Sequence, residues 1–442
     1  MGLTDTIFTY INNRKTRKEI QGTYNQAADS NYKARSVFVA QNISKQQLLL
    51  VSNDPNDDDV YTMSFESKTP GVDYIWGDNK EPECMIVSGG ENDARVRALM
   101  PFVRKSQQEN VSVIALHNSD KDLEAMIQDN SIESEFVSQS GLYYDVFRGM
   151  SVEDMAYYLY DAMPKDTKPA AESLLHALLE VVLRTDGTIT FSNLAAFPIH
   201  DLKDKLDSLQ TTGVLPLAEY REIDHYYMSG SSELDSVRIF LNKLSRQAES
   251  VFGKPRATTC NIKKILNHHG VIAIDVGNVN NDLVFDLVVS HLMLLQSQGR
   301  NFSILLDELP LSRFSKARDL IRGRTYSISS RDFISDISGG EKSSDELFSE
   351  ITGNVNTIVL LKHTSGTSCH KWSNHFGQYH KIQVKQSIAQ FNKYNDMMTD
   401  GDNRSISVEE KDVPRVRAES IGKLSGSLAC IQNSEGILFA EI

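Results

Sequence analysis

The hydrophobic pattern alternates between short apolar runs and amphipathic stretches, which predicts strands and helices in alternation. Cys84–Val87 is a short apolar run that ends at Ser88-Gly89-Gly90, and Ala94–Val103 follows with helical periodicity. Pro101 predicts an early end for this helix, and Val111–Leu116 is the next strand-like run. A strand, a glycine turn, a helix and a second strand form a right-handed crossover unit, so this region predicts a parallel sheet.

The pattern turns helical after residue 150. Apolar residues recur at helical spacing in four successive sets, which include Met155, Leu174, Leu202 and Val237. Strands and helices alternate again from about residue 258. The later elements are predicted at Val271–Val276, Leu283–Gln298, Phe302–Leu306, Ala317–Ile321 and within Ile351–Leu361. Because the α/β pattern resumes, the helical stretch is expected to be an insertion into one α/β domain.

The two ends of the chain differ from this core. The start is a polar, helix-like segment followed by strand-like pieces at Ser36–Val39 and Gln47–Val51. Residues 391–419 are polar and acidic and predict a flexible connector, and Ser427–Ile442 predicts a terminal hairpin. The expected division is an N-terminal extension (1–80), a first core part (81–150), an all-α insertion (151–257), a second core part (258–390), and an acidic connector with a hairpin (391–442).

Composition narrows the class of protein. The 442 residues are 40% hydrophobic and 24% charged, and no apolar stretch approaches the roughly 20 residues that span a bilayer. Four scattered cysteines without a paired motif fit a reducing compartment, so a cytoplasmic location is expected. The net charge of −13 excludes a uniformly basic, nucleic-acid-coating surface, although not a local basic stripe. One basic run, Arg14 to Lys18, is interpreted as a solvated helix face, with contact to nucleic acid or an anionic membrane as the alternative.

The most informative chemistry lies where an apolar run ends in two acids. Ile304-Leu305-Leu306 leads into Asp307-Glu308, the pattern of a Walker B element. A carboxylate at this strand end can hold Mg²⁺, and the next one can orient an attacking water molecule. Asp307 and Glu308 are therefore the candidate catalytic residues. The alternative is a structural one, because many buried strands end in acidic residues.

The counterpart would be a phosphate-binding loop of the form G-x-x-x-x-G-K-[ST]. In the register that starts at Gly89, the second glycine is replaced by Ala94, the lysine by Arg95 and the hydroxyl residue by Val96. The register that starts at Gly90 is no better. Both registers place Glu91 and Asp93 in the loop, where they would repel a triphosphate. Gly89, Gly90 and Arg95 are the remaining candidates for nucleotide contact, and ATP and Mg²⁺ are expected to bind weakly or not at all.

Two further groups of residues are relevant to possible sites. Arg322 and Arg324 flank Gly323 soon after the acidic pair, so they are candidates for an arginine that acts on a neighbouring subunit; a glycine helix cap between solvated charges is the alternative. No metal site is predicted. Spacing argues against a shared site for the late His and Cys residues, namely Cys369, His370, His375 and His380.

The order of these features resembles the TraG/TraD-like type IV coupling proteins, within the HerA/FtsK class of P-loop ATPases. The resemblance runs from about residue 81 to the C-terminus, and its specific positions are Asp307-Glu308 and Gly323-Arg324. It is carried by Ala170–Ile199, Gly270–Leu294, Ile304–Arg324 and Thr352–Leu360 with Trp372–Gly377 after it. The resemblance implies an α/β fold: a RecA-like P-loop NTPase core with an inserted all-α domain.

The chain departs from the family pattern in three places. Its phosphate loop is degenerate, the Gln-Ser expected at the end of the next strand is replaced in Ile334-Ser335-Asp336, and the usual N-terminal membrane anchor is not expected. The resemblance implies that the protein forms oligomers at the inner face of a membrane. It also implies three kinds of partner: other secretion or conjugation subunits, an active ATPase paralogue, and DNA or protein substrates. The leading hypothesis is a degenerate ATPase subunit that acts in assembly or as a substrate adaptor. The alternatives are an active ATP-driven translocase with a divergent loop and an interaction protein that retains only the fold.

Overall fold

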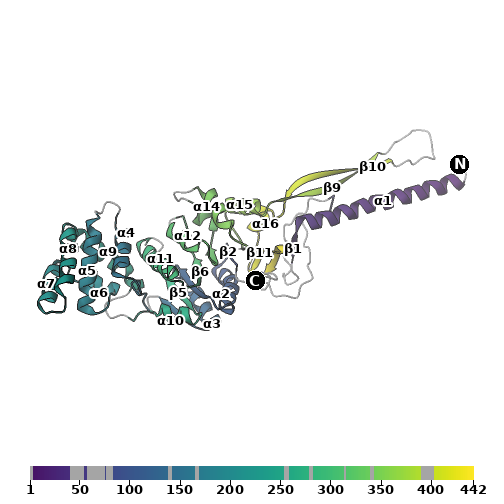
Figure 1. The fold of residues 1–442 in the computed structure, drawn as a ribbon. Helices are drawn as coiled ribbons and strands as arrows, with labels where there is room; N and C mark the ends of the chain where they lie inside the picture. Colours follow the sequence, from purple (N-terminus) through teal and green to yellow (C-terminus); the bar gives the residue numbers. More distant parts are fainter. Residues whose placement is uncertain are drawn as a thin grey trace. The chain divides into compact units, whose positions relative to one another are not determined.

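The chain forms two compact units. The computed structural model describes residues 3–39, 54–56, 75, 83–137, 142–164, 169–252, 258–277, 282–312, 315–338, 343–389 and 403–442. Unit 1 consists of Met1–Asn79, Ser88–Ala98 and Asn356–Ile442, and unit 2 consists of Lys80–Val87 and Leu99–Val355. Figure 1 labels the elements of both units. The strand predicted at Gln47–Val51 lies outside the described residues.

Unit 2 is built on a layer of parallel strands. Its strands follow the order β2-β7-β6-β3-β5-β4, and the pairs β4–β5, β5–β3, β3–β6 and β6–β7 are all parallel. All residues of β3 and β6 are buried, which explains why both read as continuous apolar runs. The bounds are β2 (Met85–Ser88, whose last residue begins a unit 1 segment), β3 (Ser112–His117), β4 (Ser134–Val137), β5 (Val271–Asp275), β6 (Phe302–Asp307) and β7 (Tyr326–Ser330).

Helices connect these strands, as right-handed crossovers require. Helix α11 carries a wide buried apolar stripe that includes Val284, Val288 and Leu292. The bounds are α2 (Asn92–Gln108, shared by the two units), α3 (Lys121–Asn130), α10 (Ile262–Asn267), α11 (Asp282–Ser297), α12 (Ser315–Ile321), α13 (Phe333–Asp336) and α14 (Ser344–Thr352). Among the helices that the structure describes, none is both long and apolar enough to cross a bilayer.

A group of helices is inserted along the chain between strands β4 and β5 of unit 2. Its central member, α5, contacts α4, α6, α7, α8 and α9, and its apolar residues from Leu174 to Val182 are fully buried. Gly230 lets α8 approach α5 closely, because a Cβ there would lie 2.5 Å from the backbone nitrogen of Leu174. The bounds are α4 (Val152–Asp161), α5 (Ala170–Asp186), α6 (Phe191–Ala196), α7 (Leu202–Thr211), α8 (Leu217–Gly230) and α9 (Leu234–Phe252), with short 3₁₀ turns at Ile199–Asp201 and Ser231–Glu233.

Unit 1 contains an antiparallel set of strands. Strand β11 pairs antiparallel with both β12 and β8, and β1 adds to β12 in parallel. The β11–β12 pair confirms the hairpin predicted at the C-terminus. The bounds are β1 (Val37–Val39), β8 (Thr357–Leu360), α15 (Gly366–Phe376), α16 (Ala418–Gly422), β11 (Leu428–Asn433) and β12 (Gly436–Glu441).

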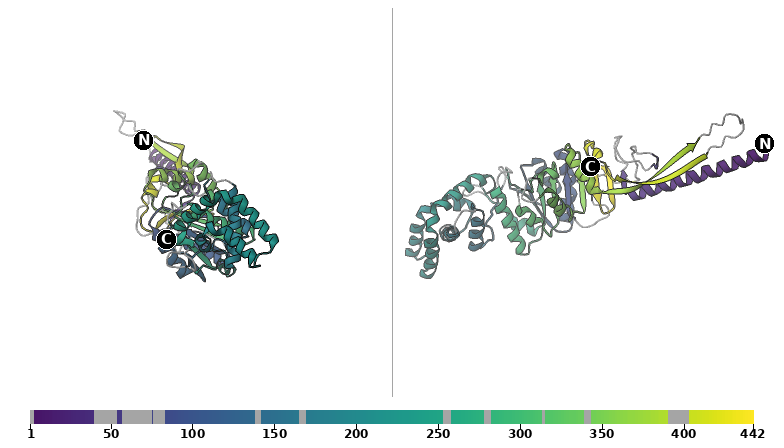
Figure 2. Two further views of the ribbon diagram at one scale, coloured as in Figure 1. Left: turned by 90° about the vertical axis from the view of Figure 1, so that its left-hand side faces the viewer. Right: turned by 90° about the horizontal axis from the view of Figure 1, so that it is seen from above.

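A long helix and a long hairpin complete unit 1. Helix α1 (Leu3–Arg35) runs beside strand β9 (Gln378–Ala389), which pairs along its full length with β10 (Asn403–Pro414) (Figure 2). The buried Asn31 fixes this contact, because its side-chain amide donates to the Ile382 carbonyl at 2.9 Å and accepts from the Ile382 N–H at 2.7 Å. The basic run Arg14 to Lys18 is exposed on α1.

Three sequence-based expectations are wrong. Residues 403–414, expected in a flexible connector, form β10, because backbone pairing along a hairpin tolerates polar side chains. Ile334-Ser335-Asp336 does not end a strand but lies in α13; the strand after β6 is β7, which ends at Ser330. Helix α2 continues through Pro101 to Gln108, because buried apolar residues on both sides of the proline offset the lost hydrogen bond.

Candidate functional site

Polar residues line up where the parallel strands of unit 2 end. In the sheet register, His117 of β3 lies beside Asp275 of β5 and beside Asp307 of β6, and Asp307 lies beside Ser329 of β7. Carboxyl ends of parallel strands share one edge of the sheet, which is where α/β proteins place their ligands. This row therefore forms a candidate site, and we call its acidic residues, Asp120, Asp275, Asp307 and Glu308, the carboxyl edge.

Asp120 joins this edge from the loop after β3. It caps α3, because its Oδ1 accepts from the backbone N–H groups of Asp122 (2.9 Å) and Leu123 (3.0 Å). Its own N–H donates to Nδ1 of the buried His117 at 3.1 Å. The neighbouring Ser119 donates its backbone N–H to Asp275 at 3.0 Å. The β3–α3 loop is thus tied to two strand ends, and the tie holds the Asp120 carboxyl in a buried position.

Asp307 is the most perturbed group at the carboxyl edge. It is fully buried, and neither of its carboxyl oxygens has a hydrogen-bond partner among the described residues. Burial raises the pKa of Asp307 to about 8, and the nearby charges of Asp120 and Glu308 add to this rise while the Ser329 hydroxyl opposes it. A divalent cation would reverse this effect, because it stabilises the charged carboxylate that burial disfavours.

Glu308 follows on a strained backbone. Its φ of +54° lies in the left-handed region that non-glycine residues rarely adopt, and its N–H donates to the Ser329 carbonyl at 2.9 Å. Strain of this kind costs on the order of 1–3 kcal/mol and concentrates at functional positions. The bend turns the chain out of β6, so the side chain after the buried Asp307 is partly exposed.

The glycine turn, the candidate phosphate-binding loop of the sequence, lies in unit 1 and is short. Strand β2 ends at Ser88 and α2 begins at Asn92, so only Gly89, Gly90 and Glu91 connect them. In a phosphate-binding loop, a longer glycine-rich segment wraps its free N–H groups around the ligand. Here the positions that would form the second part of that loop, Asn92 to Ala94, are already helical.

The glycine turn is also packed against the segment after β8. The Gly90 N–H donates to the Lys362 carbonyl at 2.8 Å, and the Leu361 N–H donates to the Ser88 carbonyl at 2.8 Å. Gly89 and Gly90 have φ values of +92° and +69°. A Cβ on Gly90 would lie 2.6 Å from that of Leu361, and one on Gly89 would lie 2.7 Å from the His363 ring. Both glycines are therefore required by local packing.

Arg95 closes the turn on itself. Its guanidinium donates to the Gly90 carbonyl at 2.8 Å and to Oδ1 of Asn92 at 3.0 Å, and the residue is only 1% exposed. The group that could replace a phosphate-binding lysine thus caps the backbone of its own loop. Glu91 and Asp93 are exposed beside it, and Asp93 forms an ion pair with Arg97.

Arg322 and Arg324 occupy the opposite edge of the unit 2 strand layer. They precede β7, whereas Asp307 ends the parallel strand β6, so they do not share a site within one chain. Arg322 pairs with Glu350 at 3.4 Å, and the Arg324 guanidinium lies 4.9 Å from the centroid of the Phe302 ring. Gly323 has a φ of +70° at the end of α12. A role at a nucleotide site would require a neighbouring subunit.

The late His and Cys residues are dispersed. Cys369, His370 and His375 lie on α15, whereas His380 lies on β9 and forms an ion pair with Asp412. Burial lowers the pKa of His375. Within the described part of the chain, no group of three His, Cys, Asp or Glu residues is arranged to hold a metal ion. Mg²⁺ commonly keeps several waters and takes only one or two carboxylates, so the carboxyl edge fits that ion even without a third ligand.

A parallel strand layer with a strand–glycine turn–helix unit, an acidic strand end and an inserted group of helices defines the class: an α/β protein with a RecA-like P-loop NTPase core and an inserted all-α domain. The bacterial conjugative coupling protein TrwBΔN70, in its unbound monoclinic form, has this fold. It is 12% identical, the match covers 93% of this chain and 90% of that one, and the TM-score is 0.50. The chain thus has the fold of the type IV coupling proteins that its sequence resembles.

Two other solved structures are similar at a lower level. They are plasmid coupling protein TrwB in complex with ADP and Mg²⁺ (14% identity, 85% and 89% coverage, TM-score 0.48) and VirB4 of Thermoanaerobacter pseudethanolicus (10% identity, 90% and 97% coverage, TM-score 0.46). No protein-family model and no curated protein sequence matches the chain.

Sequence reasoning singled out Asp307 and Glu308 but not Asp120 and Asp275, the other two acidic residues of the carboxyl edge. The sequence does contain a signal for Asp120 and Asp275, because each lies at or just after the end of an apolar run that predicts a strand. Parallel strands end at one edge of a sheet, so acids after successive runs can be expected to meet there.

Proposed function

We propose that this chain is a coupling-protein-like subunit of a type IV secretion, conjugation or related DNA-processing complex, and that it has lost the phosphate-binding half of its nucleotide site. Its fold, shared with a conjugative coupling protein, supports the first part. The closed glycine turn supports the second. In this role the chain acts in assembly or as a substrate adaptor, and an active ATPase paralogue supplies the ATP hydrolysis.

A single observation carries the loss of phosphate binding. In the three-residue turn Gly89–Glu91, the Gly90 N–H is already donated to the Lys362 carbonyl, and Arg95 caps the Gly90 carbonyl. Opening this turn would expose the buried Arg95 and break its two hydrogen bonds. A triphosphate would also meet Glu91 and Asp93, and their charge would weaken its binding.

Isothermal titration calorimetry of the purified chain with ATP and Mg²⁺ tests this proposal. We expect no binding tighter than a Kd of about 100 μM, which corresponds to roughly −5.5 kcal/mol. The same titration of Asp307→Asn serves as the matched control, because it removes the carboxylate that would hold the metal. Low-micromolar binding to the unmodified chain that disappears in Asp307→Asn would overturn the proposal.

The carboxyl edge favours a second candidate, an active ATP-driven translocase with a divergent loop. The buried Asp307 carboxyl has no hydrogen-bond partner in the described part of the chain and lies beside a strained Glu308, an arrangement that is costly to keep unless it serves a ligand. Magnesium would supply charge for phosphate there, while Asp307 would hold the ion and Glu308 would orient a water molecule. DNA-stimulated ATP hydrolysis that is lost in Glu308→Gln would establish this candidate, and the absence of hydrolysis with or without DNA would exclude it.

A further inference from the structure

Strand β10 of unit 1 has a long open edge. It pairs with β9 over all twelve of its residues without a bulge, and the two strands form a sheet of their own. Strands β1 and β4, which are also edge strands, are only three and four residues long. Proteins commonly protect a long edge with a proline, a bulge or a lysine, because it is a template for another chain. Residues 404–410 of β10 contain none of these features.

The backbone groups on this edge are identified from the opposite strand. Ile382 of β9 uses both its N–H and its carbonyl in hydrogen bonds to the Asn31 side chain, so these groups point away from β10. In an antiparallel pair, two directly opposite residues turn their backbone groups either toward each other or both outward. Glu410 lies opposite Ile382. The backbone groups of Glu410 and of every second residue back to position 404 therefore point outward, and no described residue outside the hairpin bonds to them.

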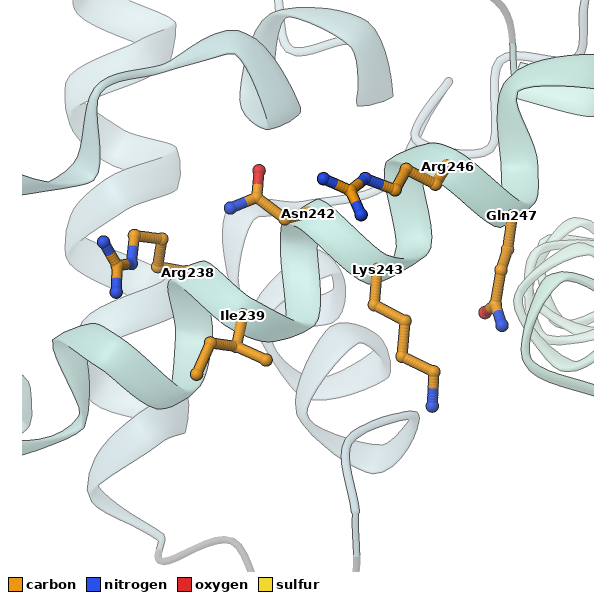
Figure 3. Close-up of a pocket in the computed structure, with 6 residues that line it drawn as sticks. All are labelled: Arg238, Ile239, Asn242, Lys243, Arg246 and Gln247. Carbon is orange, nitrogen blue, oxygen red and sulfur yellow. The ribbon is translucent and has the colours of Figure 1, made fainter.

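The side chains at these positions include exposed apolar ones. Val408 is 55% exposed, and Ile406, two residues away on the same face of the strand, is partly exposed. Ile239 of α9 is also exposed, at 61%, but it lies among the cationic and amide side chains that line a surface hollow (Figure 3). A single apolar side chain in polar surroundings needs no partner. Val408 differs because it lies on a strand edge with open hydrogen-bonding groups.

We propose that two copies of this chain pair through β10, antiparallel and about a two-fold axis at Ser407, so that the two hairpins form one four-stranded sheet. In this register Arg404 of one copy is opposite Glu410 of the second, and symmetry repeats the pair. Ile406 is opposite Val408, also twice. Opposite charges and β-branched residues are favourable cross-strand pairs. A two-fold contact requires such a self-complementary surface, and the sequence of this edge provides it.

The sequence of the edge also selects this register. With the axis at Val408, Glu410 would face Ile406, and with the axis at Ile406, Arg404 would face Val408. Both shifts lose the matched apolar pairs or the matched charges. With the axis at Ser407, the two Pro414 residues at the ends of β10 lie about 46 Å apart, so the segments that follow β10 do not compete for one space. This pairing goes beyond the proposed function and does not depend on it.

Sedimentation velocity of the purified chain tests the pairing, at low salt and from about 1 to about 200 μM, because an interface of this small size is weak. We expect a monomer–dimer equilibrium whose dissociation constant rises at least fivefold in R404E and in E410R. The double variant R404E/E410R should return to within about twofold of the unmodified chain, because the exchange restores both charge pairs. Val408→Lys should also weaken the dimer, whereas the matched control Ile239→Lys should not.

Oxidative cross-linking locates the axis. Ser407→Cys places two cysteines opposite each other in a pair without backbone hydrogen bonds, with Cα atoms about 4.5 Å apart, which is within the range of a disulfide. Glu409→Cys is the matched control, because its counterpart in the second copy lies about 13 Å away along the strand. The four native cysteines are free, so the unmodified chain gives the background. We expect a disulfide-linked dimer from S407C and none above background from E409C.

Three outcomes would overturn the proposal. A chain that stays monomeric over the whole concentration range would leave the edge to a strand of another protein. An assembly that forms equally in every variant would place the contact elsewhere. A cross-link from E409C but not from S407C would exclude the axis at Ser407.

Discussion

The carboxyl edge of unit 2 and the glycine turn of unit 1 differ in how their polar groups are paired. At the carboxyl edge, Asp307 is buried, neither of its carboxyl oxygens has a hydrogen-bond partner among the described residues, and its pKa is raised to about 8. At the glycine turn, the guanidinium of Arg95 donates hydrogen bonds to Gly90 and Asn92, so it is already engaged by its own loop. Among the described residues, the carboxyl edge holds a buried carboxyl without a hydrogen-bond partner, whereas the guanidinium of the glycine turn donates to Gly90 and Asn92. Internal closure of the turn is therefore part of the proposed loss of phosphate binding, in addition to the missing motif residues.

Gly90→Ala should have the largest effect, because it tests whether the glycine turn is a packed element. The new Cβ would lie 2.6 Å from that of Leu361, at a φ of +69°. Strain and overpacking together predict a loss of about 3–4 kcal/mol in the free energy of unfolding, measured with urea. Gly187→Ala is the matched control: its φ is +74° and no atom lies within 4 Å, so a loss of about 1 kcal/mol is expected. Equal losses would show that the turn is not packed.

Asp307→Asn should change the pH dependence of stability. The folded pKa of about 8 lies above the ordinary value of 3.8, so between these pH values the native state holds a proton that the unfolded chain has lost. The stability of the unmodified chain should therefore be complete below about pH 4 and decline as pH rises through 8. The Asn variant cannot ionise and should be about 2–3 kcal/mol more stable than the unmodified chain at pH 8.5.

Urea unfolding at pH 5 and pH 8.5 measures this difference. Asp204→Asn, an exposed position on α7, is the control and should leave the pH dependence unchanged. A variant that is less stable than the unmodified chain at pH 8.5 would mean that the Asp307 carboxyl has a favourable charged partner, and the contrast between the carboxyl edge and the glycine turn would disappear.

Arg95→Met should reveal how far the arginine holds the glycine turn closed. The change removes the donors to Gly90 and Asn92 from a buried position, so a loss of about 2 kcal/mol is expected. Arg97→Met, two residues away, removes only a partly exposed ion pair with Asp93 and should cost at most about 0.5 kcal/mol. Urea unfolding of both variants checks the ratio. If Arg95→Met instead gained affinity for ATP, the arginine would be a reversible lock on the turn.

Magnesium should have the smallest effect, and only at the carboxyl edge. At pH 8.5, 10 mM MgCl₂ should raise the unfolding free energy by about 1 kcal/mol, the value expected for a millimolar site. Asp307→Asn should show no such gain, with sodium chloride at matched ionic strength as the reference. Equal stabilisation of the two proteins would place the magnesium elsewhere and leave the carboxyl edge without a ligand.

Much of the fold could be predicted because a buried strand or helix face appears in the sequence as a local run or period of apolar residues. The strands at Val271–Asp275 and Phe302–Asp307 are buried on both faces and so appear as apolar runs. Strand β7 could not be predicted from an apolar run, because four of its five residues, Tyr-Ser-Ile-Ser-Ser, carry a hydroxyl group, although all five are buried. Strand β10 could not be predicted because it is stabilised by backbone pairing with β9, and such pairing requires no run of apolar residues.

The sequence by itself determined the parallel core, the helical insertion and the acidic pair Asp307-Glu308, since each depends on residues that are close together in the chain. Only the tertiary structure decided which groups meet. Strand register places both Asp275 and Asp307 beside His117, the loop after β3 adds Asp120, and the fold of a three-residue turn directs Arg95 onto Gly90. Those contacts join distant segments or depend on side-chain direction, and periodicity carries no information about either.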